Sequence, residues 1–181
     1  MKHRIIAWIC IAALLLFLSG CSSENTDAII IGSIHPLTGS MAYEGQALVN
    51  AQQIAVDRIN EHGGINGRKL VLKTADSLGT SAGSASAAQK LVNRGAVALT
   101  GTYTSSSAQV VSRMAEKSKV PFVVTVAATD TLLTNGYKYS FRIQPSVTVF
   151  SKNFIEYFKD IKTDDMKTVA LIYENSNYGT G

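Results

Sequence analysis

Short apolar segments of strand-like composition alternate with longer segments of helical periodicity along most of this chain. The apolar run 28–34 holds three consecutive isoleucines, and the segment 44–61 carries an apolar residue every three or four positions. The same alternation predicts further strands at 69–74, 96–100, 121–126, 139–143 and 167–173, and further helices at 80–94, 105–117 and 150–161. Because repeated strand–helix–strand units build a parallel sheet with helices on both faces, the sequence predicts a doubly wound α/β fold.

A break in this alternation divides the chain. The tripeptide Gln144-Pro145-Ser146 follows an extended segment and indicates a crossover into another lobe. We therefore expect one lobe over residues 28–143, and the crossover with the start of an incomplete second lobe over residues 144–181. The sequence stops where the next helix should begin, which we interpret as a polypeptide cut short. The single helix and strand expected in the second lobe would leave an apolar surface uncovered.

The first 27 residues have the features of an export signal. A basic start precedes an almost wholly apolar run, 5–18, which is short for a membrane-spanning helix. Leu18-Ser19-Gly20-Cys21 then resembles the lipobox of bacterial lipoproteins, which implies cleavage before Cys21 and a diacylglycerol thioether on its sulfur. An uncleaved N-terminal anchor is the alternative.

This signal predicts where the protein resides. We expect residues 1–20 to be a lipoprotein signal peptide and residues 21–27 to be a polar tether between lipid and domain. The mature protein is then exported and lipid-anchored at the bacterial cell membrane, facing the periplasm or the cell exterior. Because Cys10 lies in the leader and Cys21 is expected to be acylated, we expect no disulfide in the mature chain.

Composition excludes two other classes of protein. Hydrophobic residues make up 46% of the chain and charged residues 17%, which is too apolar for a disordered protein. The formal net charge of +4 includes Lys2 and Arg4 of the leader, and it falls to +2 without them. No basic run interleaved with aromatic residues occurs in the sequence, so we expect no nucleic-acid partner.

The residue patterns of enzymes are missing from the sequence. A zinc site needs three or four clustered ligands, and His3, His35 and His62 are too far apart to supply them. The mature chain has no cysteine nucleophile, no G-x-S-x-G turn to activate a serine, and no Walker or G-x-G-x-x-G loop to hold a nucleotide. We therefore expect no metal, no cofactor and no catalysis, and we interpret the chain as a binding protein.

Loops that follow the predicted strands carry the candidate binding groups, because ligands of an open parallel sheet bind at the carboxyl ends of its strands. The loop 101–107 leads into a helix whose free N–H groups and partial positive charge favour a carboxylate. The loop 127–130 offers a carbonyl and a threonine hydroxyl to an ammonium group, and Tyr43 is an aromatic that suits an apolar part of a ligand. Each feature alone has an ordinary explanation as a helix cap or as surface packing, but all three lie at one edge of the sheet.

Several segments together resemble a known family. They are 31–39 (IGSIHPLTG), 43–45 (YEG), 55–60 (AVDRIN), 63–69 (GGINGRK), 101–107, 121–129, 141–142, 170–174 and 178–179. This set resembles type I periplasmic substrate-binding proteins, and in particular the leucine/isoleucine/valine receptors of ABC transporters. The resemblance covers essentially the whole mature chain. It implies two Rossmann-like lobes that close on a ligand as a hinged clamp.

The resemblance also implies roles for five residues. Ser105 is implied to hold the α-carboxylate of an amino acid, while the backbone of Ala127 and the backbone and hydroxyl of Thr129 bind its head group. Tyr43 is implied to line the cleft, and Tyr178 to approach from the second lobe. The acidic residue that usually meets the α-ammonium group comes later in the family, and no position of this chain takes its place.

These observations predict a lipoprotein that captures an amino acid, by family default a branched-chain one, or a related small amide or carboxylate. It would deliver that ligand to the permease subunits of an ABC importer, and Cys21 would hold it at the membrane. A ligand sensor of the same fold is the alternative, and a serine hydrolase using Ser105 is a third hypothesis that lacks any visible base. Because the second wall of the cleft is largely missing, we expect residues 21–181 to bind ligand weakly or not at all.

Overall fold

The computed structural model describes residues 27–180, whose centre is a five-stranded parallel sheet of order β2-β1-β3-β4-β5. The strands are β1 (Ile29–His35), β2 (Leu70–Asp76), β3 (Ala98–Gly101), β4 (Phe122–Val124) and β5 (Ser140–Arg142). The helices are α2 (Ala42–Glu61), α3 (Ser81–Asn93), α4 (Ser105–Ser118) and α5 (Val147–Ile161), with a 3₁₀ helix η2 at Asp130–Leu132. The predicted doubly wound α/β fold is confirmed, while the expected signal peptide and Cys21 lie outside the described residues.

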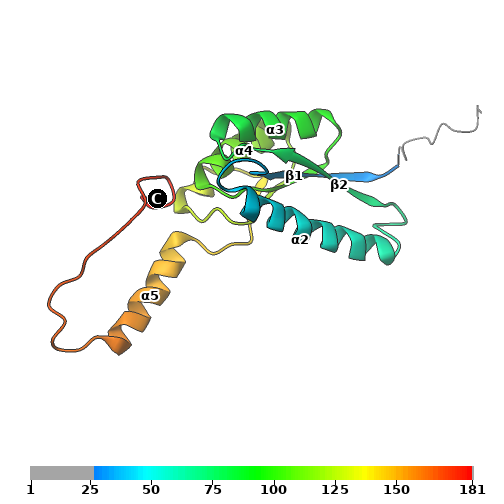
Figure 1. The fold of residues 1–181 in the computed structure, drawn as a ribbon. Coiled ribbons are helices and arrows are strands. Elements are labelled where there is room, and N and C mark those ends of the chain that lie inside the picture. Colours follow the sequence, from blue (N-terminus) through cyan, green and yellow to red (C-terminus); the bar gives the residue numbers. More distant parts are fainter. Residues whose placement is uncertain (1–26, 181) are drawn as a thin grey trace, which may run out of the picture.

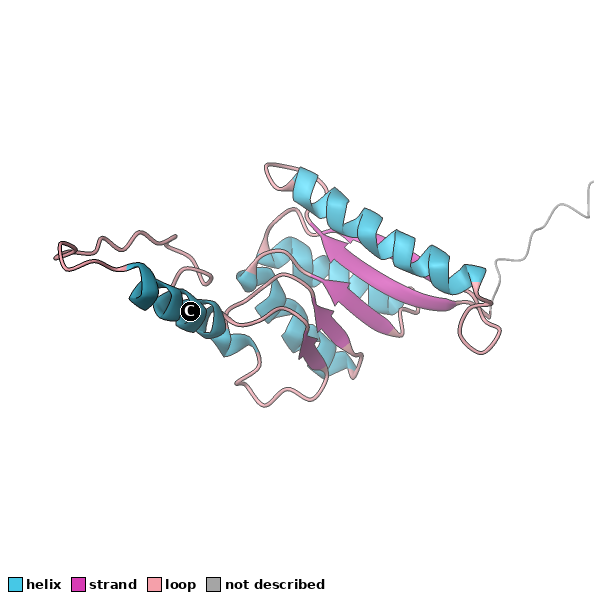
Figure 2. Cartoon of the chain, turned by 90° about the horizontal axis from the view of Figure 1, so that it is seen from below, coloured by secondary structure: helices cyan, strands magenta, loops and turns pink. Residues whose placement is uncertain are grey.

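Helices cover both faces of the sheet (Figure 1). Figure 2, seen from below, has α2 in front of the strands and α3 and α4 behind them. Because side chains alternate along a strand, Ile34 of β1 points to α3 and α4, while its neighbours Ser33 and His35 point to α2. Each layer of the lobe is therefore set by the period-two pattern of a central strand.

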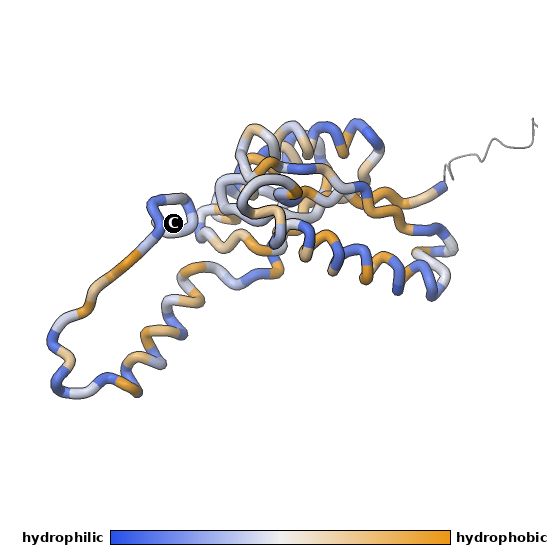
Figure 3. The backbone as a smooth tube through the Cα atoms, viewed as in Figure 1, coloured by the Kyte–Doolittle hydropathy of each residue, from blue (hydrophilic) through white to orange (hydrophobic). Residues whose placement is uncertain are grey.

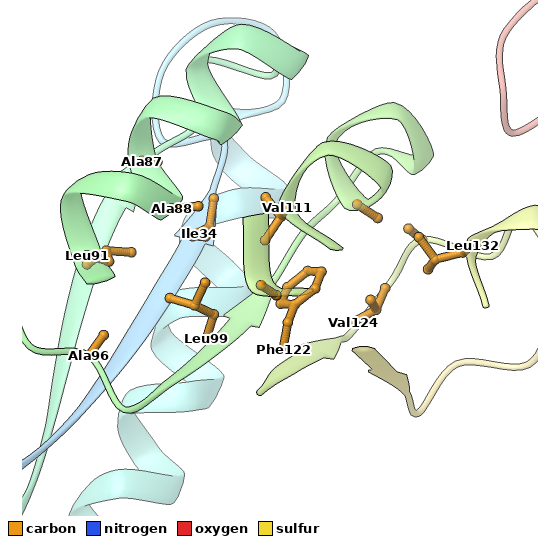
Figure 4. Packing of buried hydrophobic residues seen from close by; sticks show 13 residues of the cluster. Ile34, Ala87, Ala88, Leu91, Ala96, Leu99, Val111, Phe122, Val124 and Leu132 are labelled. Atoms are coloured by element: carbon orange, nitrogen blue, oxygen red, sulfur yellow. The ribbon is translucent and has the colours of Figure 1, made fainter. Parts of the chain in front are cut away.

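The main core lies between the sheet and the pair α3 and α4 (Figure 4). Its fully buried large side chains come from three neighbouring strands and two helices, and they include Ile34, Leu91, Leu99, Val111 and Phe122. Alanines of α3 and α4 let the two helices approach the sheet closely. Removing a buried side chain such as that of Leu99 typically costs about 2–5 kcal/mol of unfolding free energy, so this layer holds the lobe together.

The face of α2 that packs against the sheet is not the face on which its apolar residues recur in the sequence. Ile54 is 61% exposed, whereas the buried residues of this helix are Gly45 and Val56. A Cβ atom at Gly45 would lie 1.7 Å from the carbonyl oxygen of Pro36, so only glycine lets α2 begin against the loop that follows β1. The apolar spacing predicted the helix correctly but not the side that it packs.

Most predicted elements agree with the structure to within a few residues, but β4 is shorter than expected. It covers Phe122–Val124 instead of 121–126, because its neighbour β5 is itself only three residues long and pairs with those positions alone. The predicted strand at 167–173 is wrong, since the structure has no strand there. Leu171 is 85% and Ile172 is 95% exposed, and a strand without a neighbour has no partner for its backbone groups.

Residues 144–180 are less well packed than the lobe. The helix α5 has no buried residue, and Figure 3 shows hydrophobic positions along it and in the segment that returns to the C-terminus. The apolar surface expected for this part of the chain is therefore present. Within residues 27–180, no helix is both long enough and apolar enough to cross a membrane.

Candidate functional site

A cavity of about 410 Å³ lies at the carboxyl ends of β3 and β4. The lobe contributes the beginning of α4 and the loop after β4, and the segment after α5 contributes the opposite wall. The lining residues are Met41, Tyr103–Ser106, Val126–Ala128, Gln144, Phe150, Glu174 and Ser176–Tyr178. Three of the five predicted ligand-binding residues, Ser105, Ala127 and Tyr178, therefore share one cavity.

The N-terminus of α4 presents polar hydrogens to this cavity. Thr104 is the N-cap, and its side chain accepts a hydrogen bond from the Ser107 N–H at 3.3 Å. Ser105 is only 3% exposed, and its Oγ has no hydrogen-bond partner among the described residues. A buried hydroxyl beside the positive end of a 14-residue helix suits an anionic group, and an unsatisfied one costs about 1–3 kcal/mol.

Two residues of the loop after β4, Val126 and Ala127, line the cavity and have backbone carbonyls that form no hydrogen bond with another described residue. The carbonyl of Ala128 accepts from the Val147 N–H at 2.9 Å, and that of Thr129 accepts from Arg142 Nη1 at 2.7 Å. Ala127 makes no backbone hydrogen bond within the described residues and lines the cavity. Thr129 is fully buried outside the lining, with its hydroxyl 3.2 Å from that of Thr131. The structure therefore leaves the carbonyls of Val126 and Ala127 as the groups in this loop that are free to meet a ligand.

The crossover is attached directly to this loop. Asp130 accepts from the hydroxyl of Thr148 at 2.6 Å and from its N–H at 3.3 Å. Hydrogen bonds from the Ser146 and Thr148 side chains hold the pKa of Asp130 below its ordinary value. Together with the Arg142 contact, these bonds connect the start of α5 to the loop that borders the cavity.

The two predicted tyrosines occupy different environments. Tyr178 lines the cavity, whereas Tyr43 is 84% exposed at the second position of α2 and does not. Tyr103 and Met41 supply bulk from the lobe instead. Tyr103 belongs to the loop 101–107, which the sequence analysis identifies as a candidate binding loop. Its place directly before a helix could therefore have predicted that it lines the cavity. Met41 had no comparable signal, because it depends on the course of a loop.

One side chain of α4 holds the C-terminal wall in place. Asn177 Nδ2 donates to Gln109 Oε1 at 3.0 Å, and Gln109 Nε2 donates to the Thr131 hydroxyl at 3.1 Å. Lys162 N–H donates to the Phe158 carbonyl at the end of α5, and within residues 27–180 the bond to Asn177 is the only hydrogen bond between residues 163–180 and the rest of the molecule. Gln109 does not line the cavity, but it connects two segments that border it.

A separate polar cluster lies under α2 and outside the cavity. Gln52 accepts from the Ser33 hydroxyl at 2.5 Å, lies 3.1 Å from His35 Nε2, and donates to the Thr100 hydroxyl at 3.3 Å. Burial lowers the pKa of His35 to about 4. His35 is therefore neutral at pH 7 and joins β1 to α2.

The loops after β1 and β2 are fastened by a carboxylate. Asp76 accepts from the N–H groups of Leu37 and Leu78, each at 2.8 Å, and from the Thr38 hydroxyl at 2.6 Å. Burial acts to raise the pKa of Asp76, but these hydrogen bonds outweigh it and keep the pKa below its ordinary value. No cluster of three potential metal-ligating side chains occurs among the described residues.

Comparison with known proteins identifies the group of proteins to which this site belongs. Residues 28–181 match the family described as periplasmic binding protein. This chain is a member of that family. A Leu/Ile/Val-binding protein homolog 8 of Brucella abortus (strain 2308) is 32% identical over 158 residues, which cover 82% of this chain and 38% of the relative. The predicted resemblance of this periplasmic binding protein to the Leu/Ile/Val receptors is confirmed.

Solved periplasmic binding proteins share the fold. The branched-chain amino acid transporter substrate binding protein LivJ from Streptococcus pneumoniae, in complex with isoleucine, is 32% identical with a TM-score of 0.63, covering 66% of this chain and 34% of LivJ. A solute binding protein from R. palustris, in complex with 4-hydroxybenzoate, is 26% identical with a TM-score of 0.72, covering 84% of this chain and 40% of that protein. This chain thus spans 34–40% of the relatives compared here.

Proposed function

We propose that this periplasmic binding protein captures an amino acid outside the cytoplasm and delivers it to the permease subunits of an ABC importer. The observation that carries the proposal is the buried Ser105 hydroxyl, which has no partner and lines a cavity at the N-terminus of α4. A carboxylate in that cavity would satisfy the hydroxyl and meet the positive end of the helix. The unused carbonyl of Ala127 supplies an acceptor for the ammonium group of the same ligand.

The charge of the cavity favours a zwitterion. Among the described residues, Glu174 is the only charged one that lines it. A negative side chain attracts an ammonium group and repels a ligand that carries a carboxylate alone. The R. palustris protein was solved with 4-hydroxybenzoate and LivJ with isoleucine, so both ligand classes occur among relatives of at least 25% identity. We therefore propose an amino acid, with a branched aliphatic side chain packing against residues such as Phe150 and Tyr178.

We further propose that this protein binds its ligand without catalysing a reaction. A nucleophilic serine needs a base within hydrogen-bond reach, and no described side chain bonds to Ser105 Oγ. His35 instead contacts Gln52 in the cluster under α2.

We also propose the boundaries given by the sequence: a lobe over 28–143, a crossover and start of a second lobe from 144, and a lipid anchor at Cys21 after a signal peptide. A sensor role for the same fold remains the alternative.

Titration with leucine tests the proposal, and NMR detects it even when the affinity is low. In ¹⁵N-labelled protein, the amide signals of Ser105, Ser106 and Ala127 should shift with leucine and should not shift with leucinamide, which has no carboxylate. Ser105→Ala should weaken leucine binding by about 1.5–3 kcal/mol, because a hydrogen bond to a charged group is lost.

A matched control is available in the same helix. Ser112 is also buried with an unpartnered hydroxyl, but it does not line the cavity. Ser112→Ala should therefore leave the leucine affinity unchanged. Shifts that cluster away from α4, or an affinity that Ser105→Ala does not alter, would contradict the proposed site.

A further inference from the structure

The two edges of the sheet differ sharply in charge. The loops at the carboxyl edge, 36–41, 77–80, 102–104, 125–129 and 143–146, contain no charged residue. The segments before β2, β3, β4 and β5 at the opposite edge, 62–69, 94–97, 119–121 and 133–139, contain five basic residues and no acidic one. These five are Arg68, Lys69, Arg94, Lys119 and Lys138, and all are exposed. We call them the basic edge.

Ordinary stabilising roles account for only part of the basic edge. Basic residues in the last turn of a helix interact with the helix dipole, and Arg58, Lys90 and Lys117 fit that explanation. Within the basic edge, Arg94 and Lys119 are the C-caps of α3 and α4 and fit the same explanation, whereas Arg68, Lys69 and Lys138 lie outside the helices. Of its five residues, only Arg68 forms an ion pair within residues 27–180, with Asp27 at 2.9 Å. The other four form no ion pair with a described residue, and the Glu116 carboxylate at this edge accepts from the backbone N–H groups of Lys138 and Tyr139.

The chain enters the lobe at this same edge. Arg68 Nε also donates to the carbonyl of Asp27 at 2.7 Å, so the first described residue is held beside the α2–β2 loop. Figure 1 shows β1 beginning at the end of the lobe opposite α5 and the C-terminus. The six residues 22–27 reach at most about 20 Å when fully extended. A lipid on Cys21 would therefore keep the basic edge within that distance of a membrane surface.

We propose that the basic edge is a docking surface for an anionic phospholipid bilayer. The lipid phosphates meet Lys69, Arg94, Lys119 and Lys138, while the uncharged carboxyl edge and its cavity face away from the lipid in this resting orientation. The inference takes the proposed anchor as its setting, but the docking itself depends only on the charges of the lobe. The tether raises the local lipid concentration, so a weak interaction suffices to orient the molecule.

Vesicle binding by the chain without its lipid tests this surface directly. Residues 22–181, which contain every described residue, are mixed with vesicles of phosphatidylcholine or of phosphatidylcholine with 30% phosphatidylglycerol at about 50 mM salt, and bound protein is measured by sedimentation. We expect binding only to the anionic vesicles, and its loss at about 0.5 M salt. Each basic residue near an anionic surface strengthens binding about fivefold. The triple variant Arg94→Gln/Lys119→Gln/Lys138→Gln should therefore bind at least tenfold more weakly.

The matched control changes the same amount of charge at the other end of the molecule. Lys152→Gln/Lys162→Gln/Lys167→Gln removes three exposed lysines of α5 and the segment after it, none of them in an ion pair with a described residue. This control should bind like the parent protein. Hydrogen exchange of the vesicle-bound protein should show protection at 62–69 and 119–121.

Four outcomes would overturn the proposal. Equal binding to both vesicle types would point to insertion of the apolar surface of α5. If the control variant lost more vesicle binding than the variant of the basic edge, the membrane contact would lie at α5 and not at the basic edge. Equal retention by duplex DNA at the same salt would indicate a surface for polyanions in general. No binding to anionic vesicles would dismiss the surface altogether. Because neither an amino acid nor an acyl chain is present, a failure here is distinguishable from a failure of leucine binding.

Discussion

Buried His35 should make the stability of the lobe fall between pH 7 and pH 5. The ring is fully buried, its Nε2 faces the amide nitrogen of Gln52 at 3.1 Å, and its Nδ1 has no described partner. Since an amide N–H₂ group only donates, Nε2 accepts in the neutral ring and the proton resides on Nδ1. Protonation would place a second N–H against that donor and would put a charge into the space between β1 and α2.

The size of the effect follows from the pKa. Burial lowers the pKa of His35 from 6.5 to about 4. Between pH 6.5 and pH 4, His35 is protonated in the unfolded chain but remains neutral in the folded chain. The stability that the neutral, buried His35 permits is therefore present above pH 6.5 and is lost as the pH falls toward 4. Proton linkage then gives a loss of about 2 kcal/mol between pH 7 and pH 5. Asp76 and Asp130 have lowered pKa values, so their contributions are lost only at still lower pH.

Urea unfolding followed by circular dichroism at pH 7, 6 and 5 measures this loss. The parent protein should lose about 2 kcal/mol of unfolding free energy. His35→Gln should start from a lower stability at pH 7 but should lose little between pH 7 and pH 5. His62→Gln, which changes an exposed histidine outside the helices, should behave like the parent. The same pH dependence in His35→Gln as in the parent would refute the reasoning.

Two further predictions concern packing and the cavity wall. Gly45→Ala should destabilise the lobe by about 1–3 kcal/mol in urea unfolding, because the new Cβ would lie 1.7 Å from the Pro36 carbonyl oxygen; an unchanged midpoint would contradict this contact. Gln109→Ala should release the turn around Asn177, so that ¹⁵N relaxation order parameters there fall from about 0.85 to below about 0.6. Gln89→Ala, which changes an exposed residue of α3, should leave them unchanged. A turn equally ordered in Gln109→Ala would assign its position to other contacts.

The fold was largely predictable because strand and helix periods are local properties of the sequence. The buried strand 28–34 and the helix starting at Ser105 carry their signals within a few residues: an unbroken isoleucine run, and a threonine cap before a helical pattern. The segment 167–173 has the same local apolarity and is no strand, because a strand also needs a neighbour. The buried side of α2 depends likewise on Gln52 meeting polar side chains of two strands.

The candidate site was predictable only in part. Ser105 and Ala127 could be placed because each lies directly after a strand, where a parallel sheet brings its loops together. Whether Thr129 presents its carbonyl to a ligand could not be read from the sequence, since that depends on Arg142, which is 13 residues away and belongs to the next strand. The position of Tyr43 depends on the rotation of α2, and the structure turns it to solvent.

The unsatisfied hydroxyl of Ser105 and the satisfied carbonyl of Thr129 together limit what the cavity is built to hold. Arg142 donates a hydrogen bond to the Thr129 carbonyl. In contrast, the buried Ser105 hydroxyl and the Ala127 backbone have no hydrogen-bond partner among the described residues. Buried polar groups are usually paired, so those left open at one cavity favour an occupant with an anionic and a cationic end. Because fixed dipoles would hold that occupant on the lobe side, its release would need no ion pair to be broken there, which agrees with the proposed delivery to a permease.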